Sequence, residues 1–304
     1  MKAHELFKQY LWMADTIYHS NGITLQEFNE RWVQTDMSGG LPMIRQTFNR
    51  NLKNIQDMLG INIKCRIKGG YYYYIDGKED LKLHSFKSWM LDSLSINNTL
   101  MHYGSLKDRL LMEHIPSGTE YFQKIVRAMK ENLKIRITYH KFEHEAYTIT
   151  VAPYAIKVFK QRWYLLAKNY KRESPTVYAL DRMESVEMLA EKFQLPADFS
   201  AEAFFQHCYG VICDPKVEPQ LIVLRAYPPL MHYLRTLPLH HSQRELTATP
   251  EYVDFELYIS PTFDFKQELL AQGREVEVLQ PASLREDMKQ MIRGMMGRYE
   301  DAEN

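Results

Sequence analysis

Hydrophobic positions near the start of the chain recur every three or four residues, which is the period of an amphipathic helix. The first such stripe consists of Leu6, Tyr10, Met13 and Ile17. It predicts a helix over residues 4–19 that ends before Gly22. Thr24 followed by Glu27 has the spacing of a capping box, so a second helix is predicted to begin there and to run to about residue 34.

Pro42 is predicted to lie near the first turn of a third helix, where proline is tolerated. Its apolar stripe consists of Ile44, Phe48, Leu52, Ile55 and Leu59. From residue 62 to residue 75 the pattern changes to two alternating strands around Gly69-Gly70, which predicts a hairpin. Three helices followed by a hairpin are the elements of a winged helix-turn-helix, and we predict this fold for residues 1–78.

The rest of the chain divides into four further segments. Residues 79–117 are predicted to form a helical connector. Short strand-like runs between polar turns predict a small β-barrel within residues 118–190. The polar segment 191–217 is predicted to be a linker. Residues 218–304 show the order β-α-β-β-α-β, which is typical of a ferredoxin-like fold. The expected fold class is therefore α+β with several domains.

Charge is distributed unevenly, although the formal net charge of the whole chain is zero. Between Pro42 and Gly70 six bases stand against one acid, whereas the preceding residues carry a small negative excess. The polar face of the third helix presents Arg45, Gln46, Asn49, Arg50 and Lys53, and the first strand of the hairpin presents Lys64, Arg66 and Lys68. Arginine pairs with guanine, and asparagine or glutamine with adenine, in the major groove. These eight residues predict a double-stranded DNA interface, with the strand cations meeting phosphates.

Residues 124–182 carry thirteen bases and five acids, a strong basic bias on a small β-unit. The bias indicates an anionic ligand such as a nucleotide or a nucleic-acid strand. A solvated lysine surface is the alternative interpretation.

Three motifs in this unit resemble the WYL domain. They are Val151-Ala152-Pro153-Tyr154, Arg162 to Ala167 with its Trp163-Tyr164-Leu165 run, and Leu180 to Val186. Further along, Tyr233-Leu234-Arg235 and Gly273 to Pro281 resemble the C-terminal extension that often follows a WYL domain. The chain is thus similar, over nearly its whole length, to transcription regulators of the WYL type.

The resemblance implies an Sm-like β-barrel with a basic and aromatic pocket, a homodimer, and a nucleotide or single-stranded nucleic-acid effector. By motif position the pocket residues are Tyr139, Tyr154, Arg162, Tyr164 and Arg182. Trp163 and Tyr164 point to opposite faces of a strand, so only one of them lines the pocket, and the sequence leaves open which. Many members carry another arginine near Ala179, where this chain has none, and Lys157 or Lys160 is the expected substitute. Asp181 is expected to orient Arg182.

Other function classes are disfavoured. The cysteines Cys65, Cys208 and Cys213 are too few for a disulfide framework, which predicts a protein of the reducing cytoplasm. Cys208 and Cys213 have no second Cys or His pair nearby, so we predict small buried thiols there and no metal site. A signal peptide and a long apolar segment are both missing from the sequence, which predicts no membrane contact. It also lacks the motifs of nucleotide hydrolases, dehydrogenases, serine hydrolases and zinc peptidases, so we predict no enzyme and no cofactor.

The sequence therefore predicts a ligand-responsive DNA-binding transcription regulator. The alternative is a nucleic-acid-sensing accessory protein that binds single-stranded DNA, RNA or a protein partner instead of an operator.

Overall fold

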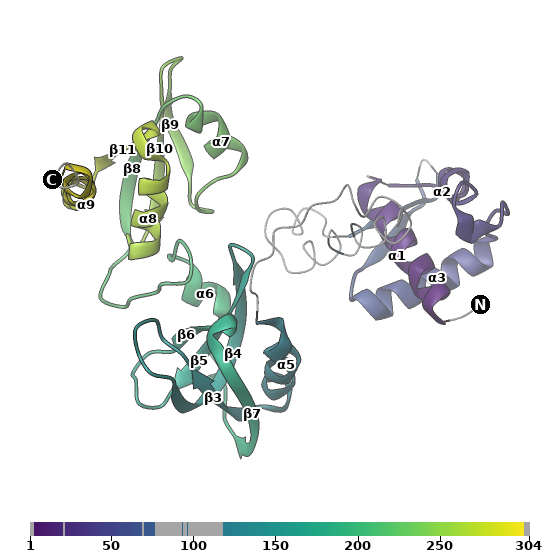
Figure 1. Ribbon diagram of the computed structural model, residues 1–304. Coiled ribbons are helices and arrows are strands. Elements are labelled where there is room, and N and C mark those ends of the chain that lie inside the picture. Colours follow the sequence, from purple (N-terminus) through teal and green to yellow (C-terminus); the bar gives the residue numbers. More distant parts are fainter. Residues whose placement is uncertain are drawn as a thin grey trace. The chain divides into compact units, whose positions relative to one another are not determined.

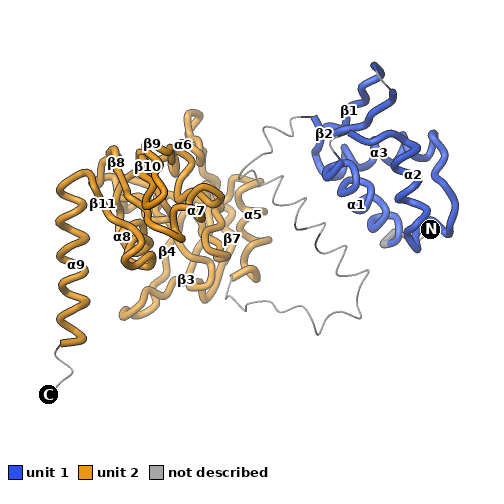
Figure 2. Tube along the Cα trace, turned by 90° about the horizontal axis from the view of Figure 1, so that it is seen from above, with its two compact units in different colours: residues 1–113 blue, residues 114–304 orange. Residues whose placement is uncertain are grey.

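The computed structural model describes residues 3–20, 22–68, 70–76, 93, 96 and 118–300. The chain divides into two compact units, residues 1–113 and 114–304 (Figure 2). The predicted helical connector, residues 79–117, lies outside the described residues apart from two positions. None of the helices in the described ranges is both long enough and apolar enough to cross a membrane.

Residues 3–76 of the first unit, as far as they are described, contain three helices and a hairpin. The elements are α1 (Ala3–His19), α2 (Leu25–Trp32), a 3-10 turn (Asp36–Ser38), α3 (Arg45–Leu59), β1 (Ile63–Arg66) and β2 (Tyr72–Ile75). The capping box at Thr24 and Glu27 is confirmed, because each side chain bonds the backbone of the other residue. Pro42 lies just before α3, and the prediction that Ile44 belongs to the apolar stripe is wrong, because Ile44 is the exposed N-cap residue of the helix.

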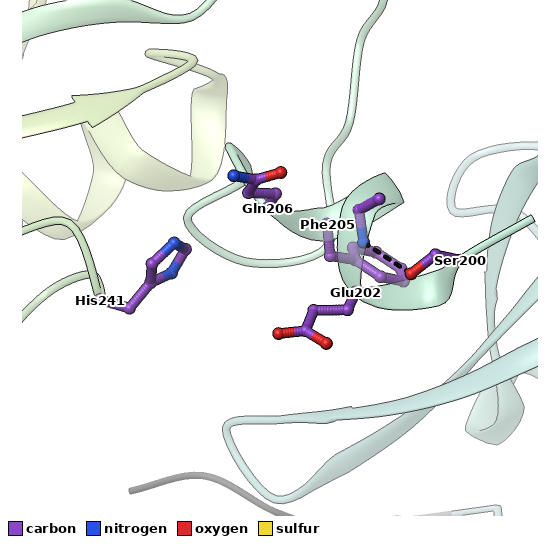
Figure 3. A pocket seen from close by; sticks show the side chains of 6 residues that line it. Ser200, Glu202, Phe205, Gln206 and His241 are labelled. Atoms are coloured by element: carbon purple, nitrogen blue, oxygen red, sulfur yellow. Dashed lines mark hydrogen bonds between the residues drawn. The ribbon is translucent and has the colours of Figure 1, made fainter. Parts of the chain in front are cut away.

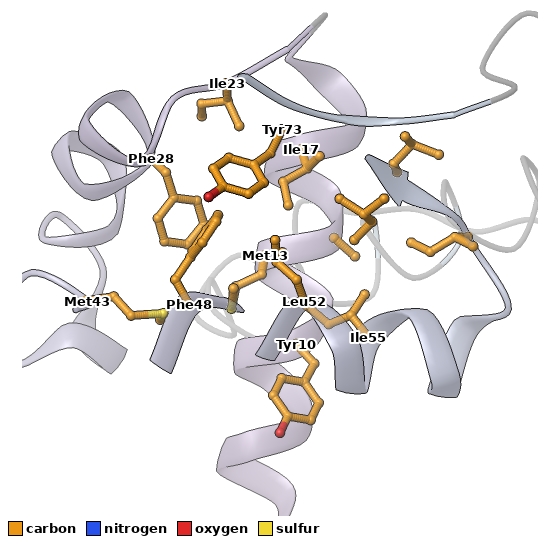
Figure 4. Packing of buried hydrophobic residues seen from close by; sticks show 14 of the residues in the cluster. Tyr10, Met13, Ile17, Ile23, Phe28, Met43, Phe48, Leu52, Ile55 and Tyr73 are labelled. Atoms are coloured by element: carbon orange, nitrogen blue, oxygen red, sulfur yellow. The ribbon is translucent and has the colours of Figure 1, made fainter. Parts of the chain in front are cut away.

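An aromatic core holds α3 against the hairpin. Phe48 contacts Phe28 on one side and Tyr73 on the other, with ring centroids 4.7 and 4.9 Å apart (Figure 4). Ile17 and Ile55 close the core from α1 and α3, and both are fully buried. Because the apolar stripe of α3 is fixed in this core, its opposite face is turned to solvent.

The second unit begins with a curved antiparallel sheet, here the middle sheet (β3–β7). Its elements are a 3-10 turn (Thr119–Tyr121), α5 (Phe122–Glu131), β3 (Leu133–Tyr139), β4 (Tyr147–Phe159), β5 (Arg162–Asn169), β6 (Thr176–Ala179), η4 (Leu180–Arg182) and β7 (Met183–Lys192). The strand order is β6-β5-β4-β3-β7. The three residues of η4 join the two end strands, so the sheet must curve. The Ala179 N–H also donates to the Tyr139 hydroxyl, which joins β6 to β3.

A second sheet, here the C-terminal sheet (β8–β11), ends the chain (Figure 1). Its elements are β8 (Gln220–Ala226), α7 (Leu230–Thr236), β9 (Arg244–Ala248), β10 (Val253–Ile259), α8 (Phe263–Ala271), a 3-10 turn (Gly273–Glu275), β11 (Val276–Gln280) and α9 (Ala282–Glu300). The strand order is β11-β8-β10-β9, and all the pairs are antiparallel. Alternate residues of β8 and β10 pack against both α7 and α8, so the two helices cover the same face.

The segment between the two sheets contains α6 (Ala201–Phe205) and a disulfide between Cys208 and Cys213. The prediction of two reduced thiols is therefore wrong for this pair. Sequence spacing alone did not indicate the bond, because the turn that brings the two Cα atoms to 5.7 Å is set by packing against Ser260 and Asp264. Cys65 is a free cysteine, and it is exposed.

Candidate nucleic-acid interface and candidate ligand site

The solvent face of α3 carries all five predicted helix residues. Arg45, Gln46, Asn49, Arg50 and Lys53 are all exposed. No acid precedes Asp57 in this helix, so its first three turns present only donors and amides. The Arg45 guanidinium lies 4.5 Å from the centre of the Tyr71 ring, and the Tyr73 hydroxyl donates to Asn49 over 3.4 Å. The hairpin therefore supports two side chains of the helix directly.

The cations of the hairpin differ in whether an acidic side chain already pairs with them. Lys64 forms an ion pair with Asp76 at 2.5 Å, and this bond raises the pKa of Lys64. Arg66, two residues on and thus on the same face of β1, lies 5.7 Å from the centre of the Tyr72 ring. The prediction that Lys68 belongs to the same strand is wrong, because β1 ends at Arg66 and Lys68 lies in the turn. Arg66 and Lys68 are both exposed and able to meet phosphates.

In the middle sheet, register brings several predicted ligand residues into one row. Lys157 pairs with Tyr164 across β4 and β5, and Tyr164 pairs with Ala179 across β5 and β6. Directly opposed residues share a face, so these three side chains lie side by side. Lys157 thus lies in the same row as Ala179, the place near which many WYL domains carry an arginine and this chain has none. Arg162 lies two residues before Tyr164, and it points to the same face.

Trp163 takes the opposite face, which answers the question that the sequence left open. Its ring centroid lies 4.7 Å from that of Phe122, and the side chain packs against the core of the middle sheet. Tyr139 is also a core residue, because it is buried and its hydroxyl accepts the Ala179 N–H over 3.2 Å. Tyr164 is therefore the aromatic residue of the motif that remains on the row with Lys157.

Asp181 forms an ion pair with Arg162. The expectation that Asp181 orients its neighbour Arg182 is therefore wrong. The curvature of the sheet places η4 beside the start of β5, and this brings the carboxylate to the more distant arginine. Arg182 instead lies over the Phe142 ring, 3.6 Å from its centre, and its Nε is buried without a hydrogen-bond partner among the described residues. Both arginines are half-buried.

Lys157 and Tyr154 are covered by the segment between the two sheets. The Lys157 ammonium group donates to the Gly210 carbonyl over 2.6 Å and lies 4.2 Å from the centre of the Phe205 ring. Burial of this group lowers the pKa of Lys157 to about 8. The Tyr154 ring lies against those of Phe193 and Phe199, with centroids 5.8 and 5.0 Å away. Both residues are half-buried by these contacts.

The basic bias of residues 124–182 is partly balanced by acids that lie outside that range. Lys134 pairs with Glu191, Arg136 with Glu187, and Lys160 with Glu268. These acids come from β7 and α8, so a count along the sequence misses them. The middle sheet is thus less cationic in space than its sequence indicates.

A cavity of about 450 Å³ lies between α6 and the turn after α7. Its lining residues are Ser200, Glu202, Ala203, Phe205, Gln206 and His241, and Figure 3 shows how they are arranged. None of them belongs to the predicted ligand set. In the described part of the chain, no group of three or more His, Cys, Asp or Glu side chains could hold a metal ion.

Two protein-family models match the parts of the chain that form the two sheets of the second unit. A WYL domain model matches residues 120–188, and a WCX domain model matches residues 218–296. No curated protein sequence matches the chain. The middle sheet is therefore a WYL domain, and the C-terminal sheet lies in a WCX domain. These two domain matches confirm the predicted resemblance to WYL-domain proteins.

Two solved structures are similar at low identity. Proteasome accessory factor B/C (PafBC) of Arthrobacter aurescens is 16% identical with a TM-score of 0.33, and the match covers 93% of this chain and 46% of that chain. A structure described as a CRISPR Cas-related protein is 15% identical with a TM-score of 0.39, and the match covers 99% of this chain and 86% of that one. The chain thus spans about half the length of the first structure.

Proposed function

We propose that the protein is a transcription regulator that binds a double-stranded DNA operator and responds to an anionic ligand of the nucleotide or nucleic-acid type. The observation that carries this proposal is the solvent face of α3, where five exposed donors and amides stand beside a cation-bearing hairpin. Arginine and asparagine on a helix that fits the major groove can read guanine and adenine edges. The WYL domain would act as the sensor.

Three finer fold assignments belong to this proposal. Helices α1–α3 with β1–β2 have the element order of a winged helix-turn-helix, with α3 as recognition helix. The curvature that joins β6 to β3 supports an Sm-like barrel for the WYL domain. The order β11-β8-β10-β9 is that of a ferredoxin-like sheet.

The proposed ligand site is the face that carries Arg162 and Tyr164, with Arg182 nearby. A guanidinium can bind phosphate through two parallel hydrogen bonds, and a tyrosine ring can stack on a base. The Asp181 carboxylate forms an ion pair with the Arg162 guanidinium, so a ligand phosphate would have to replace this carboxylate. The proposed site needs neither a cofactor nor a catalytic group.

The proposed regulator acts as a homodimer, because paired half-sites on DNA are read by paired helices. The far half of α9 supports a contact with a second copy. Its exposed apolar residues follow helical spacing and consist of Ile292, Met295, Met296 and Tyr299. They continue the stripe that Leu284 and Met288 bury in the WCX domain. Light scattering after size exclusion should show a dimer, and Met295→Glu with Met296→Glu should give a monomer, whereas Gln290→Glu on the opposite face should not.

The DNA proposal is tested by selecting bound fragments from sheared genomic DNA and measuring their affinity by fluorescence anisotropy. Two half-sites about 34–36 Å apart, or at a multiple of that distance, are expected. The double variant Arg45→Ala, Asn49→Ala should lose specific binding, and Arg127→Ala should keep it as the charge-matched control on α5. Retained specific binding by the double variant would overturn the assignment of α3. Preference for single strands over the selected duplex would favour the accessory-protein alternative.

A further inference from the structure

Residues 208–213 form a ring closed by the Cys208–Cys213 disulfide, here the cystine loop. It lies between the WYL and WCX domains, and the residues inside the ring contact both of them. Cys208 is buried and Cys213 is half-buried. The proposed regulatory function makes no use of this feature.

On the WYL side the cystine loop contacts the end of β4. Gly210 accepts the hydrogen bond from Lys157 over 2.6 Å, and the Tyr209 ring meets the Phe159 ring edge-on at 5.6 Å. The fit is close, because a Cβ atom on Gly210 would lie 2.7 Å from the Phe159 ring. The position of the Gly210 backbone therefore decides whether Lys157 has an acceptor.

On the WCX side the cystine loop is held by the start of α8. The Asp264 carboxylate accepts the backbone N–H groups of Val211 and Ile212 over 3.0 and 3.2 Å. The Tyr209 ring also lies 5.7 Å from the Phe265 ring. The only direct ion pair between the two domains among the described residues joins Lys160 to Glu268. The cystine loop thus carries much of the junction between the domains.

We propose that Cys208 and Cys213 are a reversible thiol–disulfide switch that controls how firmly the WYL domain is held to the WCX domain. The reactant is a low-molecular-weight thiol and disulfide couple of the glutathione class. In the reducing cytoplasm that the sequence predicts, disulfides are usually transient and catalytic or redox-sensing, so a pair at a domain junction fits a regulatory role better than a structural one.

The exchange balances as two thiol attacks. A small thiolate attacks Sγ of Cys213, the more exposed of the two residues, so the S–S bond breaks and Cys208 leaves as a thiolate that takes up a proton. The Phe204 carbonyl oxygen lies 3.7 Å from Sγ of Cys208, and it can accept the new S–H. A second small thiolate then attacks the mixed disulfide, which releases the Cys213 thiol and one small disulfide. Oxidation follows the reverse path.

Opening the ring has a defined consequence for Lys157. In the closed ring Gly210, Val211 and Ile212 are fixed relative to one another. The Gly210 carbonyl can therefore accept from Lys157 while the N–H groups of Val211 and Ile212 donate to Asp264. In the open chain this relation is lost, because a short closed loop restricts the backbone far more than an open one. Lys157 is then released toward the row with Tyr164. A link from this release to ligand binding rests on the proposed function, whereas the switch itself does not.

The test uses the full chain with Cys65→Ser, which leaves only the two cysteines of the switch. The protein is equilibrated with glutathione and its disulfide at a series of ratios, alkylated and weighed by mass spectrometry. We expect a single two-electron transition that is reached from both directions. Hydrogen exchange of residues 206–213 and 157–162 should become faster by on the order of tenfold upon reduction, with α5 and β10 unchanged.

Two variants complete the experiment. Cys208→Ser with Cys213→Ser should exchange fast at every glutathione ratio. Gly210→Ala should also exchange fast while its disulfide still forms, because the added methyl group would lie 2.6 Å from the Asp264 carboxylate and 2.7 Å from the Phe159 ring and so prevents close contact with both. The proposal is overturned if no disulfide forms at any ratio, or if the exchange rates are equal in both states. Loss of protection in β10 as well would show a structural disulfide and equally overturn the switch. None of these outcomes depends on DNA or ligand binding.

Discussion

The ammonium group of Lys157 in the WYL domain donates to the carbonyl oxygen of Gly210 over 2.6 Å, and this bond lies where a segment outside the sheet covers the strand. Burial lowers the pKa of Lys157 to about 8, compared with its ordinary value of 10.5. The folded protein therefore loses this proton at a lower pH than the unfolded chain does.

A pH dependence of stability follows from this shift. Between pH 8 and 10 the unfolded chain binds more protons at Lys157 than the folded protein, so the free energy of unfolding should rise with pH. Urea unfolding of the oxidised protein at pH 8.0, 8.75 and 9.5 would measure the rise. Lys157→Met should flatten it, and Lys160→Met, in the exposed turn, should leave it intact. Parallel profiles for the wild type and Lys157→Met would contradict this account of Lys157.

Replacing residues on α3 and replacing residues on the hairpin should affect DNA binding in different ways. Arg45→Ala should weaken binding of the preferred site by about 1–3 kcal/mol and relax the base preference at one position, because a bidentate contact with a base is lost. Lys68→Ala should lower the affinity for all DNA sequences alike, and it should reduce the salt dependence of that affinity by about one phosphate contact. Anisotropy titrations at several salt concentrations, with matched and mismatched duplexes, distinguish the two. If Lys68→Ala changes base preference, the turn lies in a groove and not on the backbone.

The Arg162–Asp181 pair should limit the affinity for an anionic ligand. Asp181→Asn removes the competing charge, so binding of a nucleoside monophosphate or a short single strand should become tighter by on the order of tenfold. Arg162→Ala should weaken the same binding. Arg136→Ala, which removes an exposed arginine from β3, is the control and should have little effect. Calorimetric titration measures all three, and an affinity that neither Asp181→Asn nor Arg162→Ala changes would place the ligand elsewhere.

Gly118 is required by its backbone and by its surroundings. Its φ is +64°, and a Cβ atom there would lie 2.3 Å from the carbonyl carbon of Leu180 in η4. Gly118→Ala should lower the free energy of unfolding by about 2–4 kcal/mol, from left-handed strain together with the clash. Gly273 has a similar φ of +61° with no atom within 4 Å, so Gly273→Ala should cost only about 1–2 kcal/mol. Chemical unfolding compares the two, and equal losses would show that the contact with η4 is unimportant.

Periodicity and motifs predicted much of this protein. The stripe of Phe48, Leu52 and Ile55 located the core face of α3, and so it also identified the exposed face with Arg45 and Asn49. The Trp163-Tyr164-Leu165 run and its flanking motifs indicated the WYL domain before any contact was known. Each of these signals depends on neighbours along the chain, and local spacing determines them directly.

The tertiary structure decided which charged side chains form ion pairs and which cysteines form a disulfide. Asp181 binds Arg162 and not its neighbour Arg182, Lys134 and Arg136 are balanced by acids of β7, and Cys208 bonds Cys213 beside α8. These contacts depend on strand register, on the curvature of a sheet and on the packing of two domains. A residue's own sequence neighbourhood holds no record of these relations. The sequence alone thus determined which face of α3 is exposed and that the chain contains a WYL domain, and only the fold decided which of its charges and thiols meet.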